Sequence, residues 1–379
     1  MKPPAGALLA LALVTSSACA SGGGGPPAAP RRTIAASSPA SARGSSPSAR
    51  PERLGVWDGI ATSRLSPRVA DIPPRVYVPN NHSNTLTEID PTTFRVIRTI
   101  RVGIGPQHVT PSWDLRHLYV GNTYSNTLTE IDPMSGRAVR SISVPDPYNL
   151  YFTPDGSLAI DVAERLQRLF FFDPHTWALR GSVAIPWAGA DHLDFSASGR
   201  YLLISTEFAG QVVKVNVSER KVVGSVHVGG SPVDVKLSPD GSVFYVANQV
   251  RGGVSVIDPV HMREVRFIRT GAGAHGFCIS RDARELYVSN RLEGTISVLN
   301  FASGRVERTW HVGGSPDMMQ VSADGAELWV SNRYDGTVSV IATRNGRVVR
   351  TIRVGSEPHG LTLFPQPGHF SIGHNGVYR

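Results

Sequence analysis

Short hydrophobic runs alternate with Gly, Asn, Asp and Pro along the chain, and from Tyr77 onward the pattern recurs about every 42 residues. Each repeat contains a turn, a strand ending in Tyr-Val-x-Asn or a variant of it, a polar turn, a Val-x-Val-Ile-Asp-Pro segment and a further Val-rich strand. Alternation such as Val254-Ser-Val-Ile257 is typical of strands with one buried face. The pattern predicts four antiparallel strands per repeat.

The Tyr-Val-x-Asn motif gives the phase of the repeats. Its clear copies are residues 77–80, 119–122, 245–248, 287–290 and 329–332. Ile160 and Leu203 fall in phase between them as eroded copies. In the fifth repeat the predicted strands are residues 234–237, 243–247, 253–257 and 264–268.

Units of four strands without helices are typical of β-propeller blades, with a solenoid as the structural alternative. Ser371 lies seven repeat periods after Tyr77, so in a seven-bladed ring the two segments would claim the same place. We therefore expect residues 360–364 to supply the innermost strand of the first blade, and residues 370–379 to pack beside or beneath it. The predicted fold is all-β: a seven-bladed β-propeller with four-stranded blades, closed by strands from both termini.

The N-terminal region differs in composition from the repeats. Residues 1–20 combine an early Lys, an apolar run and small residues, which is the pattern of an export signal. Ser17-Ala-Cys19 resembles the end of a bacterial lipobox, in which Cys19 would be acylated; ordinary cleavage after Ala20 is the alternative. Residues 21–53 are predicted to be a disordered Gly/Ser/Pro/Ala tether, residues 54–75 a lead-in segment, and residues 76–379 the propeller.

The formal net charge of +8 does not predict nucleic-acid binding. Residues 1–75 hold nine Lys or Arg against three acids, so only about +2 is left for the repeats, which show no basic stripe studded with aromatic residues. Once Cys19 is acylated or removed, Cys278 has no cysteine partner, and its place within a strand predicts a buried thiol.

These repeats resemble the YVTN family of seven-bladed propellers, and more closely the YncE-like extracytoplasmic proteins of bacteria. The resemblance rests on the Tyr-Val-x-Asn strands, the Ser-Pro-Asp-Gly turns, Pro106-Gln-His-Val109, Pro358-His-Gly360 and the tail from Pro365-Gln-Pro-Gly to Gly373-His-Asn-Gly376. It covers about 300 residues and implies a fold, but no particular chemistry.

In propellers of this kind the residues just after each inter-blade loop surround the mouth of the central channel. The first such position holds Gln107, Tyr148, Asp191, Val233, His275, Asp317 and His359, and the second holds His108, Asn149, His192, Asp234, Gly276, Met318 and Gly360. Imidazole and carboxylate ligands from different blades can surround one transition-metal ion, and we expect such a site to use His108, His192, His275 and His359. The alternative is that these side chains cap strand ends and bind water.

A second tier of polar residues is expected from the loops between the second and third strands of each blade. It includes Arg165, Glu207, Arg291 and Arg333. These arginines could clamp a carboxylate or phosphate, or they could pair with neighbouring acids such as Glu164, Glu293 and Asp335.

The function predicted from the sequence is an exported, lipid-anchored binding scaffold in the cell envelope, monomeric, that presents its channel mouth to a small ligand, a metal ion or another envelope protein. Two alternatives remain open: a lactonase-like hydrolase or metal-dependent redox enzyme at the same mouth, and a structural surface-layer module. Standard catalytic motifs are missing, and Gly271-Ala-Gly-Ala-His-Gly276 precedes a predicted strand instead of opening the helix of a dinucleotide site.

Overall fold

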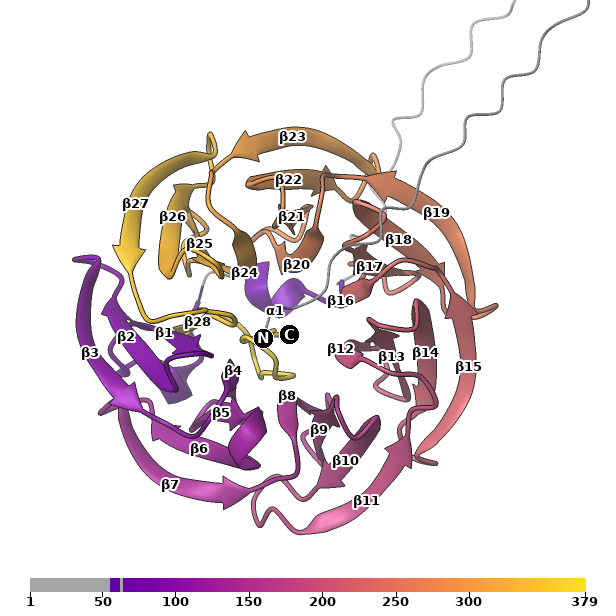
Figure 1. The fold of residues 1–379 in the computed structure, drawn as a ribbon, viewed down its shortest axis with the longest axis horizontal. Helices are drawn as coiled ribbons and strands as arrows, with labels where there is room; N and C mark the ends of the chain where they lie inside the picture. The colour runs from indigo at the N-terminus through magenta and orange to yellow at the C-terminus, as the bar shows by residue number, and fades with distance from the viewer. Residues whose placement is uncertain (1–54, 62–63) are drawn as a thin grey trace, which may run out of the picture. The chain divides into compact units, whose positions relative to one another are not determined.

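The computed structural model describes residues 55–61 and 64–379 and shows seven four-stranded antiparallel sheets arranged in a ring (Figure 1). The predicted seven-bladed propeller is therefore confirmed. The predicted signal peptide, Cys19 and the tether of residues 21–53 lie outside the described residues. Within the described ranges, none of the helices is long and apolar enough to span a bilayer.

Each blade runs from an inner strand near the axis to an outer strand at the rim. Blade 1 consists of β28 (Thr362–Phe364), β1 (Arg75–Asn80), β2 (Thr85–Asp90) and β3 (Arg95–Arg101). Blade 2 consists of β4 (Pro106–Pro111), β5 (Leu118–Asn122), β6 (Thr127–Asp132) and β7 (Arg137–Ser143). Blade 3 consists of β8 (Pro147–Phe152), β9 (Ala159–Ala163), β10 (Arg168–Phe172) and β11 (Leu179–Ala184).

The remaining blades follow the same order. Blade 4 consists of β12 (Ala190–Phe195), β13 (Tyr201–Thr206), β14 (Gln211–Asn216) and β15 (Lys221–His227). Blade 5 consists of β16 (Pro232–Leu237), β17 (Phe244–Asn248), β18 (Gly253–Asp258) and β19 (Arg263–Arg269). Blade 6 consists of β20 (Ala274–Ile279), β21 (Glu285–Asn290), β22 (Thr295–Asn300) and β23 (Arg305–His311). Blade 7 consists of β24 (Pro316–Val321), β25 (Glu327–Asn332), β26 (Thr337–Ala342) and β27 (Arg347–Arg353).

The asparagine of the Tyr-Val-x-Asn motif holds the second and third strands of a blade together. The Asn80 side-chain amide donates to the Thr87 hydroxyl at 2.9 Å, and the Asn290 amide donates in the same way to Ser297 at 3.0 Å. These amides are buried, so each bond satisfies a polar group that would otherwise be costly to bury. The same pairing recurs at Asn122 with Thr129 and at Asn332 with Ser339, whereas Asn248 donates to the Gly229 carbonyl.

The ring closes as predicted from the sequence. Strand β28 pairs antiparallel with β1, with Arg75 opposite Phe364, so the C-terminal region completes the first blade. The tail that follows extends further than predicted: the Phe152 amide donates to the Ile372 carbonyl at 2.9 Å, and the His374 amide donates to the Leu150 carbonyl at 2.7 Å. The tail therefore packs against the inner strand of blade 3 and enters the centre of the ring, instead of remaining beside blade 1.

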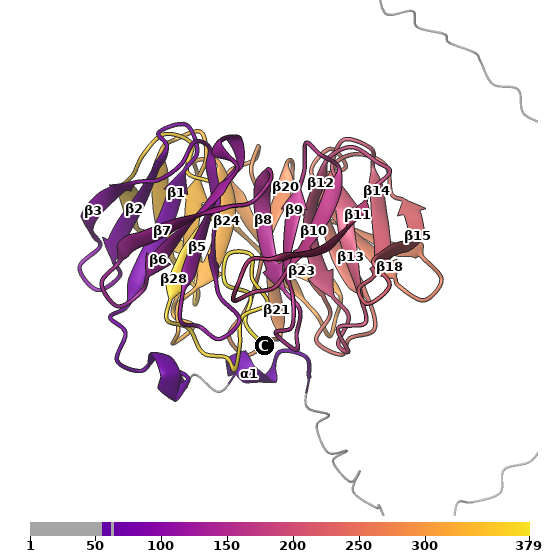
Figure 2. The same ribbon diagram turned by 90° about the horizontal axis from the view of Figure 1, so that it is seen from below.

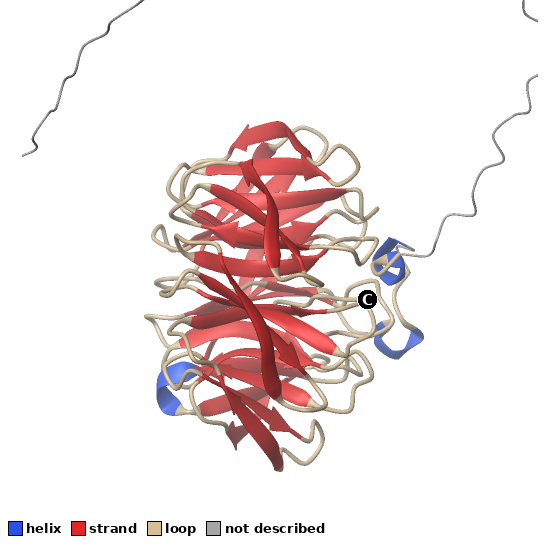
Figure 3. Cartoon of the chain, turned by 90° about the vertical axis from the view of Figure 1, so that its right-hand side faces the viewer, coloured by secondary structure: helices blue, strands red, loops and turns tan. Residues whose placement is uncertain are grey.

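The two ends of the ring are built differently. One end, the tail face, carries helix α1 (Asp58–Ala61) and the C-terminus, as Figures 2 and 3 show. Trp57 fixes the lead-in segment there, because its indole nitrogen donates to the Leu237 carbonyl at 3.1 Å. The other end, the mouth face, consists of the inter-blade loops and the loops between second and third strands. Hydrogen bonds join the two sets of loops; for example, the Tyr124 amide donates to the Ile104 carbonyl at 3.0 Å.

Candidate functional site

A bulge at the start of the inner strands explains how two successive residues can serve the centre of the ring. In blade 2, Pro106 pairs with Asn122 and Val109 with Val120, so two residues of β4 lie opposite the single residue Gly121. The same register shift occurs at the start of β12, β16, β20 and β24. A bulge of this kind leaves its extra residue free of the strand ladder and redirects its side chain.

Three imidazoles converge at the centre from distant parts of the chain. We call His108, His192 and His374 the His trio; one nitrogen from each lies within 4.8 Å of the others. Their ring centroids are 4.7 to 5.3 Å apart, and the three residues are at most 2% exposed. His108 and His192 were predicted site residues, whereas His374 was not.

The neighbours of the trio orient its rings. His108 Nδ1 lies 2.9 Å from the Asn375 side-chain oxygen, which makes Nδ1 the donor and leaves Nε2 with its lone pair. His192 Nδ1 lies 2.6 Å from an Asp191 carboxylate oxygen. Nε2 of both rings has no hydrogen-bond partner among the described residues. A second polar group that fixes the tautomer of a histidine is the usual support of a metal-ligating imidazole.

His374 reaches the trio through the tail. Its Nε2 accepts from the Asn375 amide at 3.2 Å, so its Nδ1 carries the proton and donates to the Asn149 side-chain oxygen at 3.3 Å. Gly360 makes room for this arrangement, because a Cβ at that position would lie 2.5 Å from the Asn375 side-chain oxygen and 2.8 Å from His108 Nδ1. The predicted residue Asn149 therefore positions the tail.

A second group of predicted residues lies beside the first. We call His275, Asp317 and His359 the Asp317 trio; one ligand atom from each also lies within 4.8 Å of the others. Here, however, Asp317 already forms a buried ion pair with Arg291, and His275 Nδ1 lies 2.8 Å from the same carboxylate. Arg333 approaches to 3.8 Å, so guanidinium groups have taken the carboxylate that a metal ion would need.

Two further predicted residues, Gln107 and Tyr148, flank the two trios. His359 Nδ1 lies 2.7 Å from an Arg333 nitrogen and 2.9 Å from the Gln107 side-chain oxygen. Tyr148 lies over the opposite half, with its ring centroid 5.5 Å from that of His108 and 6.0 Å from that of His192.

Burial keeps most of these imidazoles neutral. It lowers the pKa of His108 to about 3 and that of His275 to about 4, and it holds the pKa values of His359 and His374 well below their ordinary value. Burial also acts to lower the pKa of His192, but the Asp191 carboxylate outweighs it and leaves that pKa raised. Neutral imidazoles are the form that binds metal ions.

The rim above the two trios carries different ionisable side chains on its two sides. Burial, followed by the charge of Asp191, raises the pKa of Glu164 to about 8 and that of Glu207 to about 7. Arg291 and Arg333 lie on the other side, against Asp317. The rim therefore has an acidic half next to the His trio and an arginine half next to the Asp317 trio.

The rim arginines do pair with acids, but the predicted partners Glu164, Glu293 and Asp335 were wrong. Arg165 binds Asp146, Arg291 binds Asp317, and Arg333 approaches Asp317 and Glu357. The difference arises because each of these guanidiniums reaches back toward an inter-blade loop or an inner strand instead of toward the acid in its own turn. Glu207 accepts a hydrogen bond from the Gln249 amide at 2.7 Å.

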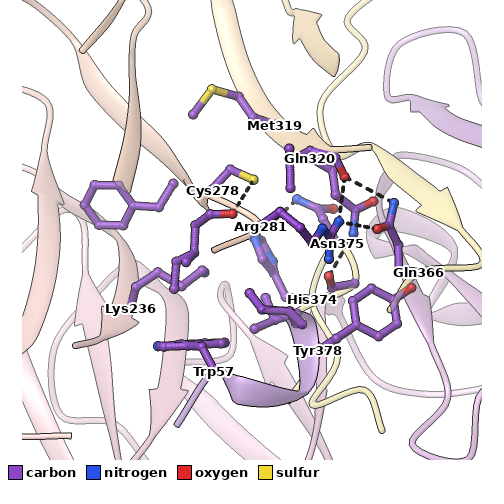
Figure 4. A pocket seen from close by; sticks show the side chains of 16 residues that line it. Trp57, Lys236, Cys278, Arg281, Met319, Gln320, Gln366, His374, Asn375 and Tyr378 are labelled. Atoms are coloured by element: carbon purple, nitrogen blue, oxygen red, sulfur yellow. Dashed lines mark hydrogen bonds between the residues drawn. The ribbon is translucent and has the colours of Figure 1, made fainter. Parts of the chain in front are cut away.

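An internal cavity of about 60 Å³ lies on the tail side of the His trio, bordered by His374, Asn375, Lys236, Cys278 and Met319 among others (Figure 4). Asp234, predicted as a channel residue, holds Lys236 Nζ at 2.9 Å and the Phe277 amide at 2.8 Å, and its role is to join blades 5 and 6. The buried thiol predicted for Cys278 is confirmed.

Two of the residues that shape the site, His374 and Asn375, were missed. They belong to the Gly-His-Asn-Gly segment of the tail, whose letters were noted, but which has no counterpart in the repeats. The phase of the repeats could not predict the position of a segment that lies outside the repeats. The two polar residues between glycines were the only signal in the sequence.

Comparisons with known proteins agree with this architecture. No curated protein matches the sequence. Among solved structures, hydrazine synthase of Kuenenia stuttgartiensis is similar with a TM-score of 0.64 and 19% identity, over 73% of this chain and 94% of that chain. A functionally unknown protein from Desulfotomaculum acetoxidans has a TM-score of 0.65 and 17% identity, over 76% and 98%.

The dihydro-heme d1 dehydrogenase NirN, solved in complex with DHE, is similar with a TM-score of 0.59 and 17% identity, over 83% of this chain and 82% of that chain. At these identities the likenesses concern the fold alone. Residues 30–367 match the profile of the YNCE-like β-propeller. That match spans most of the chain and agrees with the seven blades of the structure, so the protein belongs to the YNCE-like β-propeller family.

Proposed function

We propose that this protein is an exported, non-catalytic binding propeller that holds one transition-metal ion at the His trio. The observation that carries the proposal is the convergence of His108, His192 and His374, all buried, with Nε2 of His108 and His192 left without a protein partner. A buried polar atom without a partner is costly, and several in one place suggest a ligand that satisfies them.

The ligand set indicates the class of metal. Three imidazole ligands suit zinc, copper, nickel or iron, and do not suit magnesium or calcium, which prefer oxygen ligands. His192, whose pKa is raised by Asp191, would release its proton on binding the ion. Two nitrogens bound to one zinc ion at 2.0–2.1 Å can lie at most about 4.2 Å apart, which is close to the 4.8 Å within which the nitrogens of the trio lie. The nearby Asp191 carboxylate favours a cation here.

The burial of the His trio supports binding of an ion without catalysis. The trio is at most 2% exposed, with Tyr148 lying against it, so a substrate and a water nucleophile could not both reach the ion without rearrangement. This weighs against the lactonase-like and redox alternatives. An ion at the trio would link blade 2, blade 4 and the tail, and so would fasten the tail within the ring.

Export and lipid anchoring through Cys19 are part of the same proposal, supported by the signal-like residues 1–20 and the tether composition of residues 21–53. In a bacterial host, the chain should fractionate with membranes, and Cys19→Ser should move it to the soluble fraction. Membrane association that survives Cys19→Ser would contradict the anchor.

The direct test of metal binding is elemental mass spectrometry of the exported protein, purified without chelators and also after titration with zinc, copper, nickel and cobalt. We expect about one ion per chain, lost in the double variant His108→Gln/His192→Gln, which should keep its β-sheet circular dichroism. The matched control is His227→Gln/His311→Gln, which replaces two exposed histidines of the outer strands and should keep the ion. Absence of a stoichiometric ion from the wild-type protein, or its retention in the first variant, would refute the proposal.

A further inference from the structure

The mouth face carries a ring of exposed apolar side chains that the metal site does not use. One position recurs every 42 residues, in the turn between the second and third strands of each blade. We call these positions the mouth ring: His82, Tyr124, Leu166, Phe208, Val250, Leu292 and Tyr334. The six apolar members are 51% to 75% exposed, and His82 is exposed as well.

The opposite end of the ring provides an internal comparison. The turns between the third and fourth strands open on the tail face. The position two residues after the end of each third strand, or three residues after it in blade 3, holds Thr92, Met134, His175, Ser218, Val260, Ala302 and Arg344. Large apolar residues occur at two of these positions and at six of the seven mouth-ring positions. Exposed turns in this fold therefore need not be apolar, and exposed apolar side chains gathered on one face usually mark an interaction surface.

The arginines near the mouth ring are already paired within the chain. Arg165 binds Asp146, Arg251 binds Glu264, and Arg291 binds Asp317. Glu293 accepts a hydrogen bond from the Ala272 amide at 2.7 Å. The arginines are therefore not free to bind an acidic partner, and the exposed apolar side chains are the main contact that this face offers.

We infer that the mouth ring binds the mouth ring of a second copy of this chain, in a face-to-face dimer, in contrast to the monomer expected from the sequence. A two-fold axis perpendicular to the ring axis places one ring of apolar residues directly against the same ring, so the surface is complementary to itself.

The size of the surface agrees with this pairing. If each of the six apolar side chains supplies on the order of 100–150 Å², one copy offers roughly 600–900 Å², comparable with the about 800 Å² per partner that a standard interface buries. The tail face is less suited to such a contact, because α1 and the tail already lie on it (Figure 2). This inference does not depend on the metal site.

The test is sedimentation velocity of the full chain carrying Cys19→Ser, so that no lipid can drive association, over a range of concentrations. We expect a dimer that resists high salt, because its contacts are apolar. Phe208→Asp/Leu292→Asp should weaken dimerisation at least 100-fold, since it brings like charges into the interface. The matched variant Met134→Asp/Val260→Asp, on the tail face, should dimerise as the wild-type protein does.

Circular dichroism checks that both variants are folded, which their exposed positions favour. A wild-type chain that stays monomeric up to about 100 μM, well above a standard interface's dissociation constant, would overturn the inference. So would a dimer that survives Phe208→Asp/Leu292→Asp, because its interface would then lie elsewhere. A monomer that instead captures an apolar segment of another exported protein would also overturn it.

Discussion

The two trios at the centre of the ring use the same kinds of residue, yet their surroundings differ in charge. The His trio has the Asp191 carboxylate beside His192. The Asp317 trio has its own carboxylate, but Arg291 binds it and Arg333 lies nearby. One half of the centre therefore attracts a cation, and the other half has already been neutralised by the protein.

The comparison shows that ligand types and distances alone do not identify a metal site. Both trios place their ligand atoms within 4.8 Å of one another. What separates them is the charge nearby: guanidinium groups lie at Asp317, whereas the Asp191 carboxylate lies beside His192. A guanidinium within bonding distance of Asp317 would both repel an incoming ion and compete for the same oxygens.

The same substitution made in each half should give the largest difference in metal affinity. His192→Gln should lower metal affinity about 1,000-fold, on the order of 4 kcal/mol, because it removes a ligand. His275→Gln should change the affinity less than about threefold, on the order of 0.6 kcal/mol. Isothermal titration with zinc measures both; equal losses in the two variants would show that the halves act as one site.

The contacts of the tail that carries His374 should also contribute strongly to the free energy of unfolding. Arg379→Ala should destabilise the fold by about 3 kcal/mol, because it leaves the buried carboxylate of Asp194 without its ion pair. The matched change Arg116→Ala, at a pair 3.7 Å apart whose arginine side chain is 71% exposed, should cost under about 0.5 kcal/mol. Denaturant unfolding measures both, and similar losses would show that the tail is only loosely held.

The supporting carboxylates provide a finer contrast. Asp191→Asn should lower metal affinity about 10–100-fold, because the amide orients His192 but no longer supplies charge. Asp317→Asn should leave the affinity of the His trio nearly unchanged, although it loosens Arg291. Titration of folded protein is again the readout, and an effect confined to Asp317→Asn would place the ion in the other half.

The acidic half of the rim should also affect how the free energy of unfolding depends on pH. Burial and Asp191 raise the pKa of Glu164 to about 8, so between its unfolded value near 4.5 and about 8 the folded state holds more protons than the unfolded state. Stability therefore falls as the pH rises through this window. Glu164→Gln should remove that loss and stabilise the protein by about 1 kcal/mol at pH 8.5, with no gain at pH 4.

The control for that prediction is Glu219→Gln, at an exposed turn of blade 4, which should not alter the pH profile. Chemical unfolding at several pH values gives the profile directly. A Glu164→Gln variant whose stability follows the wild-type curve from pH 4 to 8.5 would show that Glu164 escapes to solvent when it ionises.

The repeat made the fold and much of the site predictable. The phase set by Tyr77 and its copies placed His108, His192 and Asp317 at the centre, because the inner strands β4, β12 and β24 begin with the same bulge. The charge difference between the halves was not predictable: the partner of Arg291 depends on how a side chain folds back toward the neighbouring blade.

The tail was unpredictable for a different reason. His374 follows no repeat, so nothing in the sequence fixed the distance between its imidazole and those of blades 2 and 4. Its position depends on the contacts of the tail with Leu150 and Phe152, which join segments more than 200 residues apart in sequence. Regular packing can be extrapolated along a chain, whereas a segment that crosses the ring can be located only in three dimensions.

The central claim is that a metal ion binds at the His trio and not at the Asp317 trio. The most direct measurement is an anomalous difference map from crystals of the metal-loaded protein, recorded at the absorption edge of the bound element. We predict one peak within about 2.0–2.3 Å of nitrogens of His108, His192 and His374. A peak beside Asp317, or no peak at the centre of the ring in protein that carries stoichiometric metal, would contradict the account.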